Sequence, residues 1–316
     1  MMKLREIDWK DLLVRNNTFL IFVILIIFSA IVSDSFLQPM NIRNILLQQA
    51  GPILVAIGML FVILAGGIDL SVGSLMAVGA TTAAVLMSSG FGIGTSILLA
   101  LILGGTFGLL SGVLVAYGRI QGFVATLAVM TIAKGASYLI TNGRPISIEQ
   151  NISALSSRAY GYPIIWITCI VILVALFVHR YTGYGRKVIG IGSNETALRL
   201  AGVPTRRYVL STYVFSGIFA AAAGVFVASR TSTGSASIGS GQELDAIAAV
   251  VIGGASLVGG RGFVLNTVVG ALILGMIGNM MNLMGVPSYP QDIIKGIIII
   301  VAVLLQVATG RTHRSV

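Results

Sequence analysis

The sequence is a succession of ten apolar runs joined by short polar connections, and no long stretch of the chain lies outside them. A helix needs about 20 apolar residues to cross the hydrocarbon core of a bilayer, with a range of about 17–25. The ten runs occupy residues 18–33, 50–66, 70–88, 95–117, 123–141, 163–179, 208–229, 243–258, 264–284 and 292–308. This pattern predicts an all-α, polytopic membrane protein with about ten transmembrane helices.

Charged residues are too scarce for a water-soluble domain. They make up 9% of this chain, whereas soluble domains carry about 25%. The scarcity excludes a soluble enzyme, a nucleic-acid-binding domain and a disordered chain. The net charge of +10 comes from 20 Lys and Arg against 10 Asp and Glu, spread over the connections between runs. It therefore indicates topology in a lipid bilayer, and no nucleic-acid partner is expected.

The basic residues divide unequally between alternate connections. With the N-terminus inside, 14 of them fall on the cytoplasmic side and four fall outside, while Lys134 and Lys295 lie within or at the edge of runs. Because cytoplasmic loops of membrane proteins carry an excess of Lys and Arg, the split predicts ten spans with both termini cytoplasmic. We divide the chain into a cytoplasmic N-terminal segment at 1–17, a transmembrane domain at 18–308 and a cytoplasmic tail at 309–316.

Two of the runs are weaker candidates for a full crossing. The run 50–66 is short and ends in Gly66 and Gly67, and the run 243–258 has only 16 residues. Short spans interrupted by glycine can be broken or tilted helices where the irregular backbone is buried in protein. The sequence leaves open whether 243–258 crosses the membrane fully or re-enters.

No constellation of residues points to catalysis, a metal or a cofactor. The single cysteine, Cys169, cannot form an internal disulfide, and His179 and His313 lie far apart without neighbouring metal ligands. The glycine-rich stretches 190–195 and 254–261 lack the remaining residues of a dinucleotide fingerprint or a phosphate loop. We therefore expect this chain to be no enzyme and to hold no metal or cofactor.

The connection at about 180–207 contains the signals of a short helix. Ser193 or Asn194 can cap its start, Glu195 suits its positive N-terminal end, and Gly202 can end it before Pro204. These residues, with Arg199, predict a helix of two turns between two spans. One interpretation is a structured loop that carries positive-inside arginines, and the other is a docking helix for a cytoplasmic partner.

Acidic residues stand at two places where an apolar run begins. Asp69 and Ser71 precede the third run, and Glu243 and Asp245 begin the eighth. An acid at a helix start can accept hydrogen bonds from free N–H groups and is favoured by the helix dipole. The structural interpretation is helix capping. The alternative is that the ends of broken helices line a hydrophilic passage, as in many transporters.

Three further polar residues lie inside runs. Lys134 is in the middle of the fifth run, where an ammonium group marks either a passage or ion pair, or a side chain that snorkels to the outer surface. Asn279 and Asn282 are three residues apart in the ninth run and share a helix face. They can bond another helix, which we favour, or a substrate.

Four blocks of the sequence carry a resemblance to a known family. They are Gly-Gly-Ile-Asp-Leu-Ser-Val-Gly-Ser at 66–74, Gly-Arg-Ile-Gln-Gly-Phe-Val-Ala-Thr-Leu at 118–127, Thr-Asn-Gly-Arg-Pro-Ile at 141–146 and the stretch from Glu243 to Gly260. Together they resemble the permease subunits of bacterial sugar ABC importers, and within that family the ribose group. The resemblance covers about residues 18–308.

The resemblance implies more than the composition does. Such permeases look like ten-helix domains of the bacterial inner membrane that pair as two copies, with the passage for a monosaccharide at their interface. A periplasmic sugar-binding protein delivers the sugar, and a cytoplasmic tandem-domain ATPase binds ATP and Mg. The segment Ser193–Gly202 matches the position of the coupling helix that sits in a groove of the ATPase.

An ion-coupled secondary transporter of a small polar solute is the alternative function. Asp69, Asp245 and Lys134 motivate it, because proton and sodium coupling use ionisable groups inside the membrane. The scarcity of such groups in the runs speaks against it.

Overall fold

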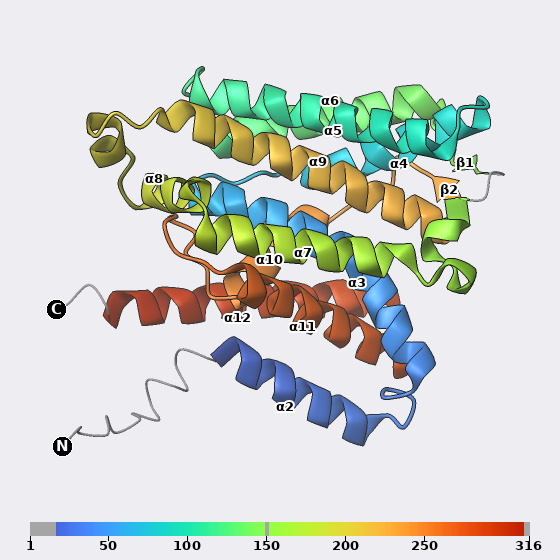
Figure 1. Cartoon of the computed structure of the whole chain (residues 1–316). Coiled ribbons are helices and arrows are strands. Elements are labelled where there is room, and N and C mark those ends of the chain that lie inside the picture. Colours follow the sequence, from blue (N-terminus) through green and yellow to red (C-terminus); the bar gives the residue numbers. More distant parts are fainter. Residues whose placement is uncertain (1–16, 149–151, 313–316) are drawn as a thin grey trace.

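The computed structural model describes residues 17–148 and 152–312. Within these residues the protein is an all-α bundle whose long helices lie side by side (Figure 1). The helices are α2 (Asn17–Val32), α3 (Pro39–Leu64), α4 (Val72–Ser88), α5 (Ile93–Ala116), α6 (Gly122–Thr141), α7 (Pro163–Tyr181), α8 (Gly183–Leu200), α9 (Thr205–Thr231), α10 (Gln242–Ile252), α11 (Val264–Leu283) and α12 (Ser288–Thr312).

Two short strands and two single-turn helices complete the described chain. They are β1 (Ile146–Ser147), β2 (Thr233–Gly234), η1 (Ile152–Ser156) and η2 (Arg158–Tyr160). The strands pair antiparallel, with Ile146 opposite Gly234, so the connection after α6 is joined to the connection after α9. The expected terminal segments fall largely outside the described residues, at 1–16 and 313–316.

Each of the ten apolar runs contains a helix, but two boundaries were wrong. The helix expected at 50–66 is α3, which begins at Pro39 and has 26 residues, because Pro39 starts the helix and the polar turns before the run continue it. The run 243–258 contains only the 11-residue α10, which ends at Ile252 before Gly253 and Gly254. At 1.5 Å per residue, α10 is about 16 Å long and cannot cross a hydrocarbon core of about 30 Å alone.

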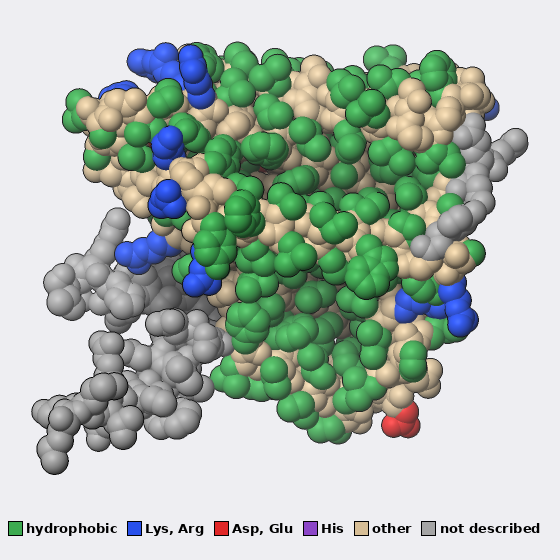
Figure 2. Space-filling view, viewed as in Figure 1, with side chains coloured by type: hydrophobic (Ala, Val, Ile, Leu, Met, Phe, Trp, Pro, Cys, Tyr) green, Lys and Arg blue, Asp and Glu red, His purple; other side chains and the backbone are tan. Residues whose placement is uncertain are grey.

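Six helices in the described part of the chain are long and apolar enough to cross a membrane: α3, α5, α6, α7, α9 and α11. In the space-filling view, hydrophobic side chains cover the middle of the molecule, and Lys and Arg gather toward its two ends (Figure 2). An apolar band between two basic ends is the surface expected of a protein that sits in a bilayer.

Helix α3 runs through the centre of the bundle and is buried along most of its length. It packs against α9, where a Cβ on Gly58 would be 3.0 Å from the Cα of Ser216. On the other side of α9, Gly104, Gly108 and Gly112 of α5 lie directly on its backbone. These glycines recur every four residues, so they form one helix face and allow the backbones of α5 and α9 to approach closely.

Candidate functional site

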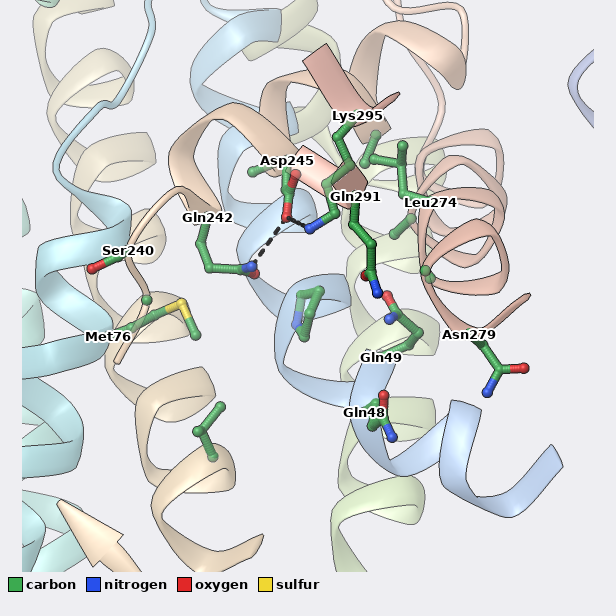
Figure 3. Close-up of a pocket in the computed structure, with 18 of the residues that line it drawn as sticks. Gln48, Gln49, Met76, Ser240, Gln242, Asp245, Leu274, Asn279, Gln291 and Lys295 are labelled. Atoms are coloured by element: carbon green, nitrogen blue, oxygen red, sulfur yellow. Dashed lines mark hydrogen bonds and ion pairs between the residues drawn. The ribbon is translucent and has the colours of Figure 1, made fainter. Parts of the chain in front are cut away.

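A pocket of about 350 Å³ lies between α3, α10, α11 and α12 and is closed on one side by the connection before α10 (Figure 3). Its lining is Gln48, Gln49, Pro52, Met76, Val227, Arg230, Ser237, Gly239, Ser240, Gln242, Asp245, Ala246, Ala249, Ala271, Leu274, Gly275, Gly278, Asn279, Asn282, Gln291 and Lys295. Three of the seven predicted passage residues, Asp245, Asn279 and Asn282, belong to this lining.

Six primary amides dominate the polar part of the lining: Gln48, Gln49, Gln242, Asn279, Asn282 and Gln291. Four of them are held by neighbours. Asn279 exchanges two hydrogen bonds with Asn41 of α3, at 3.0 and 2.8 Å, and Gln291 donates to the Oδ1 of Asn282 at 2.8 Å. The predicted role of Asn279 as a link between helices is therefore confirmed, and Asn282 links α11 to α12.

Gln48 and Gln49 differ from the other amides, because their side chains bond no other described residue. Gln49 lies against the backbone of Gly275 on α11, in the space that a Cβ at position 275 would fill. The glycine thus makes room for the glutamine. In Figure 3 the side chains of Gln48 and Gln49 lie next to each other, with Gln291 above Gln49.

One ion pair belongs to the lining of the pocket and joins two helices. Lys295 of α12 lies 3.5 Å from the carboxylate of Asp245 on α10, and no other ion pair joins residues in the described ranges. Gln242 donates to the same carboxylate at 3.2 Å (Figure 3). The side chains of Lys295 and Asp245 are 33% and 24% exposed, so their charges neutralise each other in a partly hydrated ion pair.

Asp69 and Ser71 lie outside the pocket and anchor the start of α4. The buried carboxylate of Asp69 accepts hydrogen bonds from the backbone and hydroxyl of Ser71, at 3.0 and 2.5 Å, and from the Ser216 hydroxyl at 2.7 Å. The same short connection is fixed by Thr126 of α6, whose hydroxyl accepts from the amide of Leu70 at 3.1 Å. Asp69 thus has a structural role at the helix start, as the sequence predicts, but the residue before α4 is Ser71, whose side chain makes no capping bond.

Glu243 and Lys134 also lie outside the pocket lining. Glu243 is in the first turn of α10, where no side-chain capping bond forms, and its carboxylate lies against Gly73 in the first turn of α4. The capping expected there is therefore wrong in detail, because the position before the helix is Gly241. Lys134 donates to the carbonyl of Ala236 at 2.6 Å, so it holds the connection before α10, and it forms no ion pair with another described residue.

The predicted short helix forms the second part of α8. Asn194, at φ −161° and ψ 90°, interrupts α8, and its side chain accepts from the amide of Ala197 at 2.9 Å. Gly202, at φ +81°, ends the helix and donates to the carbonyl of Arg199 at 3.0 Å. Glu195 accepts from the hydroxyl of Thr205 at 2.9 Å. Between the alternatives Ser193 and Asn194, Asn194 is the capping residue.

The sequence did not indicate that a helix also precedes this kink. In that first part of α8, Tyr184 packs between Phe61 and Tyr208 and shares a hydrogen bond with the Ser211 hydroxyl at 2.8 Å. Burial raises the pKa of Tyr184 to about 12, so the hydroxyl stays neutral at physiological pH. The first part of α8 is thus fixed to α9, and the second part projects beyond it (Figure 1).

Comparison with known proteins identifies the family. Residues 41–303 match the family described as the branched-chain amino acid transport system / permease component. The chain belongs to this permease family. The family and the six apolar helices make it a multi-pass protein of the inner membrane. No solved structure matches the chain.

Curated relatives of this permease are similar over nearly their whole length. A ribose import permease protein, RbsC, from Haemophilus influenzae is 40% identical over 92% of this chain and 93% of its own. RbsC of Bacillus subtilis is 40% identical over 95% of both chains. The L-arabinose transport system permease protein AraH of Escherichia coli is 35% identical over 94% of this chain and 91% of its own.

Most pocket residues of the permease were not predicted, among them four amides and an ammonium group that are central to its chemistry: Gln48, Gln49, Gln242, Gln291 and Lys295. The position of some of them beside or inside an apolar run could have marked them as candidate site residues. Gln48 and Gln49 directly precede an apolar run, and Lys295 stands near the start of another, where an uncompensated polar group is expensive. Their meeting in one cavity depends on the packing of α3, α10 and α12, which the sequence does not show.

Proposed function

We propose that the chain is the transmembrane subunit of an ATP-driven importer and forms the passage for a monosaccharide, ribose. The observation that carries this proposal is the similarity to ribose import permeases over more than nine-tenths of the chain. The polar pocket supports it, because Gln48 and Gln49 present amides to the cavity in addition to the four amides that neighbouring side chains hold, and a polar lining inside a membrane domain suits a polar solute.

We infer ten membrane crossings, with both termini in the cytoplasm. Helix α2 begins, and α12 ends, at the end of the bundle where α8 projects (Figure 1). Helix α10 is short, so it completes its crossing together with the connection before it. The proposed division keeps a cytoplasmic segment at 1–17, a transmembrane domain at 18–308 with the cytoplasmic connection at about 180–207, and a cytoplasmic tail at 309–316.

The second part of α8 is the proposed contact with a cytoplasmic tandem-domain ATPase, which binds and hydrolyses ATP with Mg. It is a capped, two-turn helix at the end of the bundle, formed by Ser193, Asn194, Glu195, Arg199 and Gly202. Leu200 at its tip is 83% exposed. An exposed apolar tip on a rigid, charged helix suits insertion into a groove of a partner.

For the passage we propose the pocket residues Asp245, Asn279 and Asn282. Asp69, Ser71, Lys134 and Glu243 take supporting roles in this proposal, because their contacts fix helix starts and connections outside the lining. The same contacts argue against the ion-coupled alternative, since Asp69 and Lys134 are hydrogen-bonded to neighbouring groups and Asp245 is paired with Lys295. A second permease copy and a periplasmic sugar-binding protein complete the proposed importer.

The test is to isolate the tagged chain gently from its native membrane and to identify its partners by mass spectrometry. We expect an ATPase with two nucleotide-binding domains and a second permease copy. In reconstituted vesicles, ribose uptake should require ATP, this ATPase and the binding protein. Accumulation of ribose by the purified chain on a proton or sodium gradient alone would contradict the proposal.

A further inference from the structure

The amide-lined pocket is bordered by residues of five helices, α3, α4, α9, α10 and α11, by the connection before α10 and by α12. We propose that it is a monosaccharide-binding site, present once in each copy, in which Gln48 and Gln49 contact the sugar. This inference rests on the proposed function and deepens it, because it names two side chains that bond the sugar.

The chemistry of the lining fits a neutral, hydroxyl-rich solute. A primary amide presents two N–H donors and an acceptor oxygen, and a sugar hydroxyl both donates and accepts. Four of the six amides in the lining are engaged with protein groups. Gln48 and Gln49 have no hydrogen-bond partner among the described residues and line the cavity, so they are the two amides best prepared to bond a solute.

The position of Gln49 is fixed by a close approach of two helices. The side chain lies against Gly275, and any larger residue on α11 at that point would displace it. Gln48 is exposed and Gln49 is half-buried, so one amide stands toward the opening and the other deeper. A volume of about 350 Å³ falls within the range of about 300–1,000 Å³ for small-molecule sites.

The charges of the pocket favour a sugar over an amino acid. A zwitterion would need a free cation and a free anion at the spacing of its own charges. Arg230 is a further cation of the lining, but Asp245, the one acid among the described lining residues, is paired with Lys295 at 3.5 Å, so the ammonium group of a zwitterion would have to separate that pair. A sugar can bond the amides and leave the ion pair intact. Because the family description names branched-chain amino acids, L-leucine is the informative competitor.

The experiment measures protection of a thiol placed in the pocket. In the full chain, in lipid nanodiscs, Cys169→Ser removes the native thiol. Gly278→Cys then adds one at a lining position where a Cβ meets no atom within 4 Å. D-ribose should slow its reaction with a thiosulfonate by a factor of 1 + [ribose]/Kd, about elevenfold at ten times Kd. Leu274→Cys is a second pocket probe, in case the first variant does not fold.

The matched control is Gly94→Cys in the same background, at an exposed position outside the pocket that also has open space for a Cβ. Ribose should not change its reaction rate. In the pocket-probe variant, Gln49→Ala or Gln48→Ala should raise the ribose concentration for half protection by about threefold to tenfold. Gly275→Ala should act similarly by displacing Gln49, whereas Gly135→Ala, on the exposed face of α6, should have no effect.

The outcomes separate this inference from the proposed function. If neither pocket probe is protected while ATP-driven ribose uptake is intact, the pocket is not the sugar site and the function stands. Protection by L-leucine and not by D-ribose overturns both the sugar site and the choice of ribose. Protection that Gln48→Ala and Gln49→Ala leave unchanged overturns the assignment of these two side chains.

Discussion

The backbone amide of Gly260 donates a hydrogen bond of 3.1 Å to the carbonyl oxygen of Leu64. It ties the connection after α10 to the last residue of α3. Gly192 of α8 lies against both groups, and a Cβ on Gly192 would collide with the Leu64 carbonyl and the Gly260 amide. Backbone from three elements therefore meets at one point, two residues before the kink at Asn194.

We predict that Gly192→Ala disrupts this junction. The added methyl group has no space, so either α8 or the Leu64–Gly260 hydrogen bond must move, and overpacking of this kind costs about 1–3 kcal/mol of unfolding free energy. The midpoint of thermal unfolding in detergent should fall. ATP-driven uptake should fall further than the amount of folded protein explains, because the displaced segment leads into the proposed coupling helix.

The matched control is Gly183→Ala on the same helix, where a Cβ would meet its nearest atom only at 3.9 Å, at the tip of the Arg186 side chain. We expect its stability to be unchanged or slightly raised, since alanine is the better helix former. Equal effects of the two substitutions would show that the junction has no special role.

A second prediction concerns the coupling helix. Glu195→Ala together with Arg199→Ala should leave the permease folded and inserted, because both side chains are exposed and Glu195 makes one hydrogen bond, to Thr205. ATP hydrolysis should become uncoupled from transport. Uptake and sugar-stimulated ATPase activity in reconstituted vesicles measure this, and normal values of both would contradict a coupling role.

A third prediction distinguishes structure from ion coupling at Asp69. Asp69→Ala leaves the hydroxyls of Ser71 and Ser216 without their buried partner, and we expect a loss of about 3 kcal/mol in unfolding free energy. Asp34→Ala, at an exposed acid in the connection after α2, should stay within about 0.5 kcal/mol of the original protein. Thermal unfolding in detergent compares the two variants.

In reconstituted vesicles, Asp69→Asn should retain ATP-driven uptake with no change in its response to proton or sodium gradients. A gradient dependence that is present in the original protein and lost in this variant would instead identify Asp69 as a coupling residue.

The fourth prediction is a double-mutant cycle on Asp245 and Lys295. Each single change, Asp245→Asn or Lys295→Met, leaves one uncompensated charge at the pocket and should lower stability and uptake. The double variant should be more stable than the sum of the single effects predicts, by on the order of 1 kcal/mol. Additive effects would show that the two charges contribute independently.

The sequence was most informative where local chemistry decides the structure. The apolar runs contain the helices, and the capping signals at Asn194 and Gly202 produce the expected turn and stop. Boundaries failed where packing overrides composition. Helix α3 continues back through polar residues to Pro39 because its neighbours bury and bond them, and α10 ends at Ile252 inside an apolar run.

The pocket was only partly predictable, for a physical reason. Asp245, Asn279 and Asn282 are polar groups inside apolar runs, and that alone marks them. Gln49 and Gly275 become partners only because α3 and α11 lie in contact. Their chain separation of more than two hundred residues leaves no pattern that a single sequence can display.

The lone cysteine has a practical consequence. Cys169 lies on an exposed face of α7, so each copy carries one attachment point for a spin label without any mutation. Dipolar spectroscopy on the labelled protein would give no intramolecular distance, and any distance measured would therefore belong to a pair of copies. The unmodified chain can therefore report the distance between copies that assemble in the bilayer.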